Sequence, residues 1–316
     1  MIKSAFVWNP AGADRDLAQV SLDLKAGRYH EARALISATR QDFELRATRS
    51  LVLASVAAGL DVAERWIAEE PSNPDALLIY ARTAVARALR AADVNDERSG
   101  DLAALAQRAC LVSADADPSD PTPWAGLLAL ARLGHAKVPG PEGVTAEGPW
   151  DLLGEARARD PLNREAHHRL LSCFYARYGG SHDAMWEAAR WMSLNTPPDC
   201  SLQVLPLTAY VEHYRALRED PVRGQFADRQ WTDQHALFTS MHVFDGWFRK
   251  AQDEELVPVS DFSVLAHALY MGDRHWEAAK VFRAMGPYAT THPWSLFGEP
   301  AEQLARARQR CRVRAP

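Results

Sequence analysis

The stretch RYGGSHDAMWEAARWM, residues 177–192, contains a double glycine followed by Ser-His-Asp and an apolar-periodic run. Such a sequence is compatible with a strained catalytic loop or with a corner between two helices. The chain repeats the pattern, because GRYHEA at 27–32 and GDRHWEAAKVF at 272–282 also place a histidine shortly after a glycine. Glycine commonly ends a helix in the left-handed conformation, and the following residues start the next helix. The three stretches therefore predict structural corners. The new helices are expected to start around His30, His182 and His275.

The middle corner carries its own capping residues. Ser181 is expected to be the N-cap, with its hydroxyl accepting a hydrogen bond from an otherwise unpaired backbone N–H. Asp183 in the first turn complements the positive end of the helix dipole. A functional role for His182 stays open, because a helix N-terminus favours the neutral imidazole and can present it to a ligand.

A second repeated element is an acidic or polar helix end followed by proline. It occurs in EEPSNPDA, ADPSDPTPW and RDPLNREA, whose prolines Pro71, Pro118 and Pro161 lie 47 and 43 residues apart. Apolar residues between these punctuation points recur with helical spacing, and no sustained period-two alternation or Asn-Gly hairpin turn is present. The sequence thus predicts an all-α protein of about fifteen short helices joined by turns.

The two repeated elements together resemble the tetratricopeptide repeat. The best matches are GDRHWEAAKVF, with Ala278 and Phe282, and LDLKAGRYHEARALI, with Ala32. The resemblance implies an α-solenoid, a right-handed stack of antiparallel helical hairpins. It extends over a single domain, residues 1–316, or over two parts: N-terminal repeats in 1–145 and His/aromatic-rich repeats in 146–316. The GGS corner also resembles a group of tetratricopeptide-like bacterial proteins that carry a domain of unknown function.

Composition limits the classes of partner. The formal net charge of -5 gives nucleic acid or an anionic membrane surface no general attraction. The apolar run at 50–60 is shorter than the roughly 20 residues that span a bilayer, and the N-terminal apolar run is too short for a signal peptide. The four cysteines form no CxxC pair, so they are expected to be reduced and mostly structural. These features predict a cytoplasmic protein without nucleic-acid or membrane partners.

Histidines and aromatic residues are concentrated in the second half of the chain. Residues 161–316 hold nine of the eleven histidines and twenty of the 28 aromatic residues. In a helical-repeat solenoid one helix of each pair lines the concave face, so these side chains are expected to converge in a groove built by residues 163–270. We expect this groove to bind a protein or peptide segment. The candidate contact residues are Tyr175, Tyr210, His213, Tyr214, Phe238 and His242.

An enzyme is the alternative interpretation. His168, His213 and the pair His242 and Asp245 fall on separate predicted helices, and together they could hold a metal ion or act as acid and base on a bound peptide or small molecule. The chain has no HxxxH or HExxH motif, and only Glu165 with His168 and His242 with Asp245 have helical i,i+3 spacing. No cofactor is predicted, and a metal ion remains an open alternative.

Other features carry weaker expectations. The ten tryptophans are interpreted as packing residues between helices. The C-terminal stretch QLARARQRCRVRA predicts an amphipathic helix whose exposed arginines face solvent or meet an acidic partner. No phosphate-binding glycine loop, nucleophile elbow or Ser/His/Asp order is found. The sequence therefore predicts an architecture more firmly than an activity.

Overall fold

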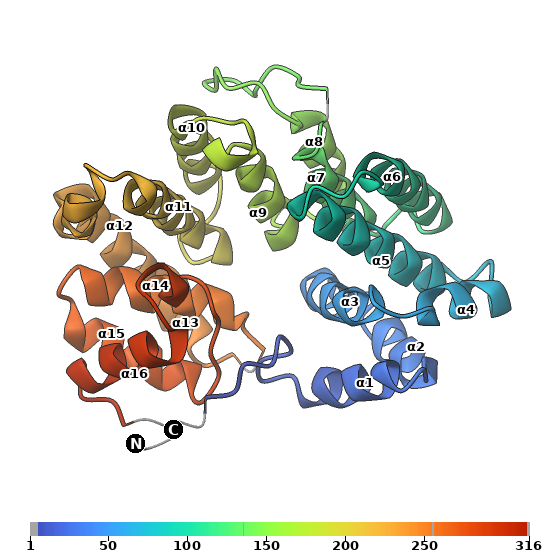
Figure 1. Cartoon of the computed structure of the whole chain (residues 1–316), viewed down its shortest axis with the longest axis horizontal. Helices are drawn as coiled ribbons and strands as arrows, with labels where there is room; N and C mark the ends of the chain where they lie inside the picture. The colour runs from blue at the N-terminus through green and yellow to red at the C-terminus, as the bar shows by residue number, and fades with distance from the viewer. Residues whose placement is uncertain (1–5, 135, 255, 315–316) are drawn as a thin grey trace. The chain divides into compact units, whose positions relative to one another are not determined.

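The computed structural model describes residues 6–134, 136–254 and 256–314 of the chain (Figure 1). This part is built from α-helices and short 3-10 or π-helical segments, and it contains two isolated β-bridges but no strand. The predicted all-α class is confirmed, and the sixteen α-helices of the described residues agree with the expected number. Within the same residues, none of the helices is both long and apolar enough to cross a bilayer.

The chain divides into two compact units. The N-terminal unit is Asp14–Ala188, and the C-terminal unit combines Met1–Ala13 with Ala189–Pro316. The boundary therefore falls within the helix α10, whereas the sequence pattern suggests a division at residue 145. The first described residues belong to the C-terminal unit, because the backbone of Val7 forms a parallel bridge with Tyr288.

The N-terminal unit contains nine helices, one 3-10 turn and the first part of a tenth helix. They are α1 (Arg15–Lys25), α2 (His30–Ser37), α3 (Phe43–Ala57), α4 (Val62–Glu69), α5 (Pro74–Asp93), α6 (Ser99–Ala116), α7 (Thr122–Ala131), α8 (Trp150–Arg159), α9 (Arg164–Cys173), η1 (Ala176–Tyr178) and α10 (His182–Leu194). α5 packs against α3, α6 and α7, and α7 packs against α9. Small side chains such as Ala81, Ala88 and Ala106 line these contacts, which lets the helices approach closely.

The three proline turns of the N-terminal unit share one hydrogen-bond pattern. In each turn the backbone N–H of a capping residue donates to the carbonyl three residues earlier, and its side-chain oxygen accepts from an N–H of the next helix. The capping residues are Asn73, Asp120 and Asn163, with first bonds of 3.1 Å in every case and second bonds of 2.9, 2.8 and 2.9 Å. The repeated sequence thus forms a repeated local structure.

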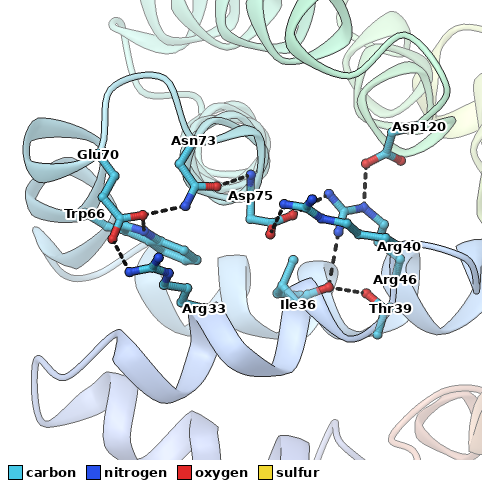
Figure 2. A network of polar contacts seen from close by, with 10 residues as sticks. All are labelled: Arg33, Ile36, Thr39, Arg40, Arg46, Trp66, Glu70, Asn73, Asp75 and Asp120. Atoms are coloured by element: carbon cyan, nitrogen blue, oxygen red, sulfur yellow. Dashed lines mark hydrogen bonds and ion pairs between the residues drawn. The ribbon is translucent and has the colours of Figure 1, made fainter.

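A buried arginine connects two of these turns (Figure 2). Arg46 of α3 is 1% exposed, and its guanidinium donates to Asp120 at 2.6 Å, to Asp75 at 2.8 Å and to the Ile36 carbonyl at 3.2 Å. The two carboxylates, each 2% exposed, stand at the starts of α7 and α5. A buried charge is tolerated only when it is paired and hydrogen-bonded, and here one guanidinium satisfies two carboxylates. Arg46 therefore fixes the relative position of α3, α5 and α7.

Arg82 repeats the arrangement two helices further along the chain. It is buried in α5 and donates to both carboxylate oxygens of Glu165 in α9, at 2.7 Å each. Burial alone would raise the pKa of Glu165, but the guanidinium groups of Arg82 and Arg169 outweigh burial and hold that pKa below its ordinary value. Glu165 is thus a structural carboxylate, ionised to hold α9 against α5.

The C-terminal unit is richer in 3-10 and π-helical segments. Its elements are the end of α10, η2 (Ser201–Val204), α11 (Leu205–Glu219), η3 (Gly224–Thr232), α12 (Gln234–Val243), the π-helical η4 (Phe244–Phe248), α13 (Arg249–Ala251), α14 (Val259–Met271), α15 (His275–Met285), η5 (Trp294–Leu296) and α16 (Pro300–Arg310). The buried α14 is central, because it packs against α11, α12, α15 and η3. The buried core of the C-terminal unit is rich in aromatic side chains, among them Tyr214, Trp231, Trp294 and Phe282.

The three predicted corners are confirmed as the starts of new helices, but at the third corner the left-handed residue is Asp273 and not Gly272, whose φ is -84°. α2, α10 and α15 begin at His30, His182 and His275, and the hydroxyl of Ser181 accepts from the N–H of Ala184 at 3.1 Å. Each corner contains a left-handed residue followed by an N–H that bonds back to the carbonyl five residues earlier, which is the Schellman geometry. The left-handed residues are Gly27 (φ +78°), Gly179 (φ +82°) and Asp273 (φ +58°). The bonds that follow them are Arg28 to Asp23 (3.0 Å), Gly180 to Tyr175 (3.1 Å) and Arg274 to Leu269 (2.8 Å).

The double glycine has two separate structural reasons. Gly179 supplies the left-handed backbone, whereas a Cβ on Gly180 would lie 2.2 Å from the Phe174 carbonyl oxygen. The Gly-Gly-Ser-His-Asp stretch is therefore a corner, as its repetition predicts.

Candidate functional site

Two of the expected contact residues lie in the core. Tyr214 is 0% exposed, and its hydroxyl donates to Asp228 at 2.6 Å. Burial, followed by the bond to this carboxylate, raises the pKa of the phenol above its ordinary value. Tyr175, in the N-terminal unit, is also buried and stacks on Tyr178 with ring centroids 6.3 Å apart. A partner cannot reach either ring in this structure, so both are corrected here from groove contacts to packing residues.

Tyr210 and His213 lie half-buried on α11 and are linked by one glutamine. Gln230 donates through Nε2 to the Tyr210 carbonyl at 2.8 Å, and its Oε1 lies 2.5 Å from Nδ1 of His213. Because an amide oxygen only accepts, Nδ1 of His213 carries the proton. This contact holds α11 against η3, which gives His213 a structural partner.

Phe238 and His242 remain on the surface of α12. Phe238 is 71% exposed, and its ring stacks on His242 with a centroid distance of 6.2 Å and an interplanar angle of 12°. Asp245, further along, forms an ion pair with Arg249 at 2.7 Å. Phe238 and His242 therefore form an exposed aromatic surface, and the Asp245 carboxylate is already paired with Arg249.

The four candidate metal ligands are not gathered into one site. His168 lies on α9 in the N-terminal unit, whereas His213, His242 and Asp245 belong to the C-terminal unit. Over residues 6–134, 136–254 and 256–314, no three histidine, cysteine or carboxylate side chains lie close enough to hold a metal ion.

A cleft of about 440 Å³ opens in the C-terminal unit. It is bounded by η3, the end of α14 with the corner that follows, the η5 segment and α16. The residues that line it are Asp228, Arg229, Thr232, Tyr270, Met271, Asp273, Trp294, Phe297, Gln303 and Arg310. Apolar and aromatic walls with a few convergent polar groups are typical of ligand sites, which have volumes of roughly 300–1,000 Å³.

The aromatic wall of the cleft is fixed from behind. The indole N–H of Trp294 donates to Ser263 Oγ at 2.9 Å, and its ring packs 5.9 Å from Phe282 and 6.3 Å from Tyr270. Phe297 packs against Tyr214 with centroids 5.3 Å apart. Because these rings are held by the core, the wall needs little reordering when a ligand binds.

His267 lies directly behind this wall. It is 0% exposed, sits edge-on to Trp294 and Trp231 at 5.5 and 4.9 Å, and neither ring nitrogen has a hydrogen-bond partner in the described part of the chain. Burial lowers the pKa of the imidazole to about 3, with a smaller contribution from His292. His267 is therefore a neutral core residue at physiological pH.

Two arginines in the cleft lack an acidic partner. Arg229 lies over the Phe226 ring at 4.6 Å, and Arg310 ends α16. Within residues 6–134, 136–254 and 256–314 neither guanidinium forms a hydrogen bond or an ion pair. The two carboxylates of the cleft are oriented elsewhere, since Asp228 accepts from Tyr214 and Asp273 lies 3.7 Å from His275. The cleft thus places two exposed arginines and two aspartates beside aromatic rings.

A second hollow, of about 610 Å³, lies along α1 and α2 in the N-terminal unit. Its charged side chains include Asp23, which is already paired with Arg28, and His30 is its only ring. It lacks the combination of a fixed aromatic wall and unpaired charge. The cleft of the C-terminal unit is therefore the better candidate site.

Only one part of this cleft was predicted from the sequence. The basic face of the C-terminal helix includes Arg310, and an acidic partner is among the expectations for that face. Trp294 and Phe297, however, come from the irregular segment around η5, where no periodicity marks a wall. Arg229 lies in a 3-10 segment whose contact with α14 depends on packing alone. Among the walls of the cleft, only the arginine-rich last helix was indicated by the sequence as a candidate binding surface.

Comparison of the chain with known proteins leaves this site without a counterpart, since no family model, curated protein or solved structure matches it.

Proposed function

We propose that the chain is a binding protein that holds a peptide segment of a partner protein in the cleft formed by η3, α14, η5 and α16. The observation that carries the proposal is a hollow lined by the partly exposed rings of Tyr270 and Phe297, which the nearly buried Trp294 supports from behind, beside the exposed side chains of Arg229 and Arg310. Aromatic anchors in a preformed hollow contribute most of the binding free energy in many interfaces. A cleft of about 440 Å³ accommodates one or two side chains of a bound segment.

We further propose that the N-terminal unit is a tetratricopeptide-like array of helical hairpins. Support comes from the proline turns at Asn73, Asp120 and Asn163, which share one hydrogen-bond pattern. Further support comes from two buried arginines, since Arg46 links α3 to the starts of α5 and α7, and Arg82 links α5 to α9. In such arrays each repeat contacts mainly its neighbours. An experimental structure in which α3 with α4, α5 with α6, and α7 with α8 superpose as equivalent hairpins would support this assignment. Hairpins of unrelated crossing angles would contradict it.

The binding proposal is tested by selecting peptides from a random phage-displayed library on the full chain and measuring their affinity by fluorescence polarisation. Thr232→Trp fills the cleft from the end of η3, where the threonine hydroxyl bonds only locally to the Arg229 carbonyl at 3.1 Å. We expect this variant to bind the selected peptides with at least about tenfold lower affinity, because the introduced indole excludes the ligand side chain from the cleft.

The matched control is Phe238→Ala with His242→Ala, which removes the exposed ring pair on α12. Peptides that bind the cleft should keep their affinity for this double variant. If instead the Thr232→Trp protein binds normally and the α12 variant does not, the site lies on α12 and the cleft assignment is wrong. A library that yields no binder contradicts the binding function itself.

A further inference from the structure

We propose that the ring of Phe297 is a movable part of the cleft wall, and that an uncharged hydrogen-bonding group of the ligand reaches the nitrogens of His267 and Trp231 behind it. This inference rests on the proposed binding function and specifies the ligand side chain that enters the cleft most deeply. That side chain carries an amide or a hydroxyl group and no charge.

Three nitrogens buried behind the cleft have no hydrogen-bond partner among the described residues. They are Nδ1 and Nε2 of His267 and the indole Nε1 of Trp231. The two side chains are 0% and 1% exposed, and their rings meet edge-on with centroids 4.9 Å apart. Buried polar groups are nearly always hydrogen-bonded, because a group that loses water without gaining a partner destabilises the fold. Two such side chains in contact therefore indicate a place for a hydrogen-bonding group.

The other polar rings around His267 already have partners. The indole N–H of Trp294 donates to Ser263 at 2.9 Å, and the hydroxyl of Tyr214 donates to Asp228 at 2.6 Å. The centroids of these two rings lie 5.5 and 6.1 Å from that of His267. Among the described rings that surround the imidazole, the unsatisfied nitrogens are thus confined to the edge-on pair.

Phe297 is shared between the cleft and these inner rings. Its side chain lines the cleft, and its ring packs on His267 and Tyr214 with centroids 5.0 and 5.3 Å apart. Phe297 is only partly buried, and it lies in the irregular segment between η5 and α16. A side chain at the edge of a core changes rotamer more readily than an enclosed one. The reordering is confined to this one ring, because Trp294 is 1% exposed and hydrogen-bonded in place.

Hydrogen-bonding capacity and charge define the group that enters behind Phe297. An indole N–H only donates, whereas a neutral imidazole donates through one nitrogen and accepts through the other. Burial lowers the pKa of His267 to about 3, so its imidazole is neutral near pH 7. A charged ligand group would lose its hydration among these rings without gaining a counter-ion. An amide or a hydroxyl both accepts and donates hydrogen bonds at a smaller desolvation cost, and it therefore fits.

Access to His267 is measured first, without a ligand. The full chain is treated with diethyl pyrocarbonate, which modifies neutral imidazole, and the modification rate of each histidine is followed by peptide mass spectrometry. Phe297→Ala removes the ring that packs on His267 from the cleft side, so we expect the His267 rate to rise by at least about tenfold. Circular dichroism checks that this variant keeps its helices.

Phe248→Leu is the matched control for global unfolding. Phe248 is a 1% exposed phenylalanine of the same unit that packs against Phe244 and Phe262. Opening at Phe297 does not require unfolding of the unit, so this variant should keep the His267 rate within about twofold of wild type. A rise as large as that expected for Phe297→Ala, or an unreactive His267 in every protein, overturns the movable wall. Wild type and Phe248→Leu decide this even if Phe297→Ala does not fold.

The ligand chemistry is tested with the peptides selected from the random library. Changing their amide or hydroxyl residue to its apolar counterpart (Gln to Leu, Tyr to Phe or Ser to Ala) should lower the affinity for wild type about five- to tenfold. His267→Phe keeps a ring but removes both nitrogens, so it should bind the unchanged peptides about five- to tenfold more weakly. In this variant the apolar change should cost no more than about twofold, since the hydrogen bond is already lost. His235→Gln, at an exposed position outside the cleft lining, should behave as the wild type.

The other results separate this inference from the binding function. Peptides that bind the cleft equally well in wild type and His267→Phe leave the function standing and overturn the inference, and a trapped water is then the partner of the two rings. A requirement for a charged residue at the deepest position, coupled to His267 in the same cycle, also overturns it. If the library yields no binder, the proposed function and this inference fail together.

Discussion

His267 and His167 are histidines that the fold keeps uncharged. His267 is enclosed by aromatic rings, and His167, 1% exposed, donates through Nδ1 to the Asn163 carbonyl at 2.7 Å. Burial lowers their pKa values to about 3 and about 4, respectively. In the unfolded chain both rings take up a proton near pH 6.5, whereas the folded rings do not until far lower pH.

This difference predicts a loss of stability in mild acid. Because the unfolded state binds more protons between about pH 6.5 and pH 4, each histidine lowers the free energy of unfolding by up to about 1.4 kcal/mol per pH unit there. The contribution is absent above pH 7. Urea unfolding of wild type and His267→Leu from pH 7.5 to 4.5 should show a shallower acid loss in the variant. His235→Gln, at an exposed position, is the control; identical slopes for wild type and His267→Leu would contradict the prediction.

Two glycines are expected to respond oppositely to alanine. A Cβ on Gly180 would lie 2.2 Å from the Phe174 carbonyl, so Gly180→Ala should destabilise the chain by about 1–3 kcal/mol through the backbone shift it forces. Gly154 is exposed in the middle of α8 and would meet nothing within 4 Å, so Gly154→Ala should stabilise by up to about 1 kcal/mol. Thermal unfolding followed by circular dichroism compares the two, and a stable Gly180→Ala variant would show that the close approach is not required.

Helices α3, α5 and α7 depend on one guanidinium for their register. Arg46→Met keeps much of the side-chain volume but leaves Asp75 and Asp120 buried without their shared partner. We expect a loss of about 3–5 kcal/mol, since removing one member of a buried ion pair leaves an uncompensated charge. Asp75 retains Arg40 at 3.1 Å, so the larger effect should fall on Asp120 and the start of α7.

The experiment is denaturant unfolding of Arg46→Met beside Arg98→Gln. Arg98 also pairs with an aspartate, at 2.8 Å, but its side chain is 78% exposed, and no measurable change is expected for it. Equal midpoints for Arg46→Met and wild type would mean that α3, α5 and α7 are held by apolar packing alone. Adding Asp120→Asn to Arg46→Met should restore part of the loss, because the uncompensated charge is then removed.

Across the whole chain, features set by a few neighbouring residues were predictable from the sequence. The corners after Gly27 and Gly179 and the capping by Ser181 follow from local backbone chemistry, and so does the all-α class. The position of the third corner was also predictable, but its left-handed residue is Asp273 and not the expected Gly272. Side-chain direction was not predictable in the same way. Tyr214 lies on an amphipathic helix rich in aromatic and charged residues, where either face can turn inward, and packing against Trp231 decided its burial.

The cleft was beyond sequence reasoning for a related reason. Its walls come from segments between residue 228 and residue 310, and nothing in their local sequence specifies that they meet. The division of the chain was also hidden, because the first described residues pair with Tyr288 through the backbone. Backbone pairing of an isolated bridge requires no distinctive side chain.

The bridge between Val7 and Tyr288 has a consequence for synthesis on the ribosome. The two residues are roughly 280 positions apart, and translation at about 5–20 residues per second separates their appearance by about 15–60 s. During that interval residues 6–13 have left the exit tunnel without the segment they pair with, while every residue of the N-terminal unit is already available for folding. The C-terminal unit is thus completed only after nearly the whole chain has been translated, and its N-terminal segment must stay accessible until then.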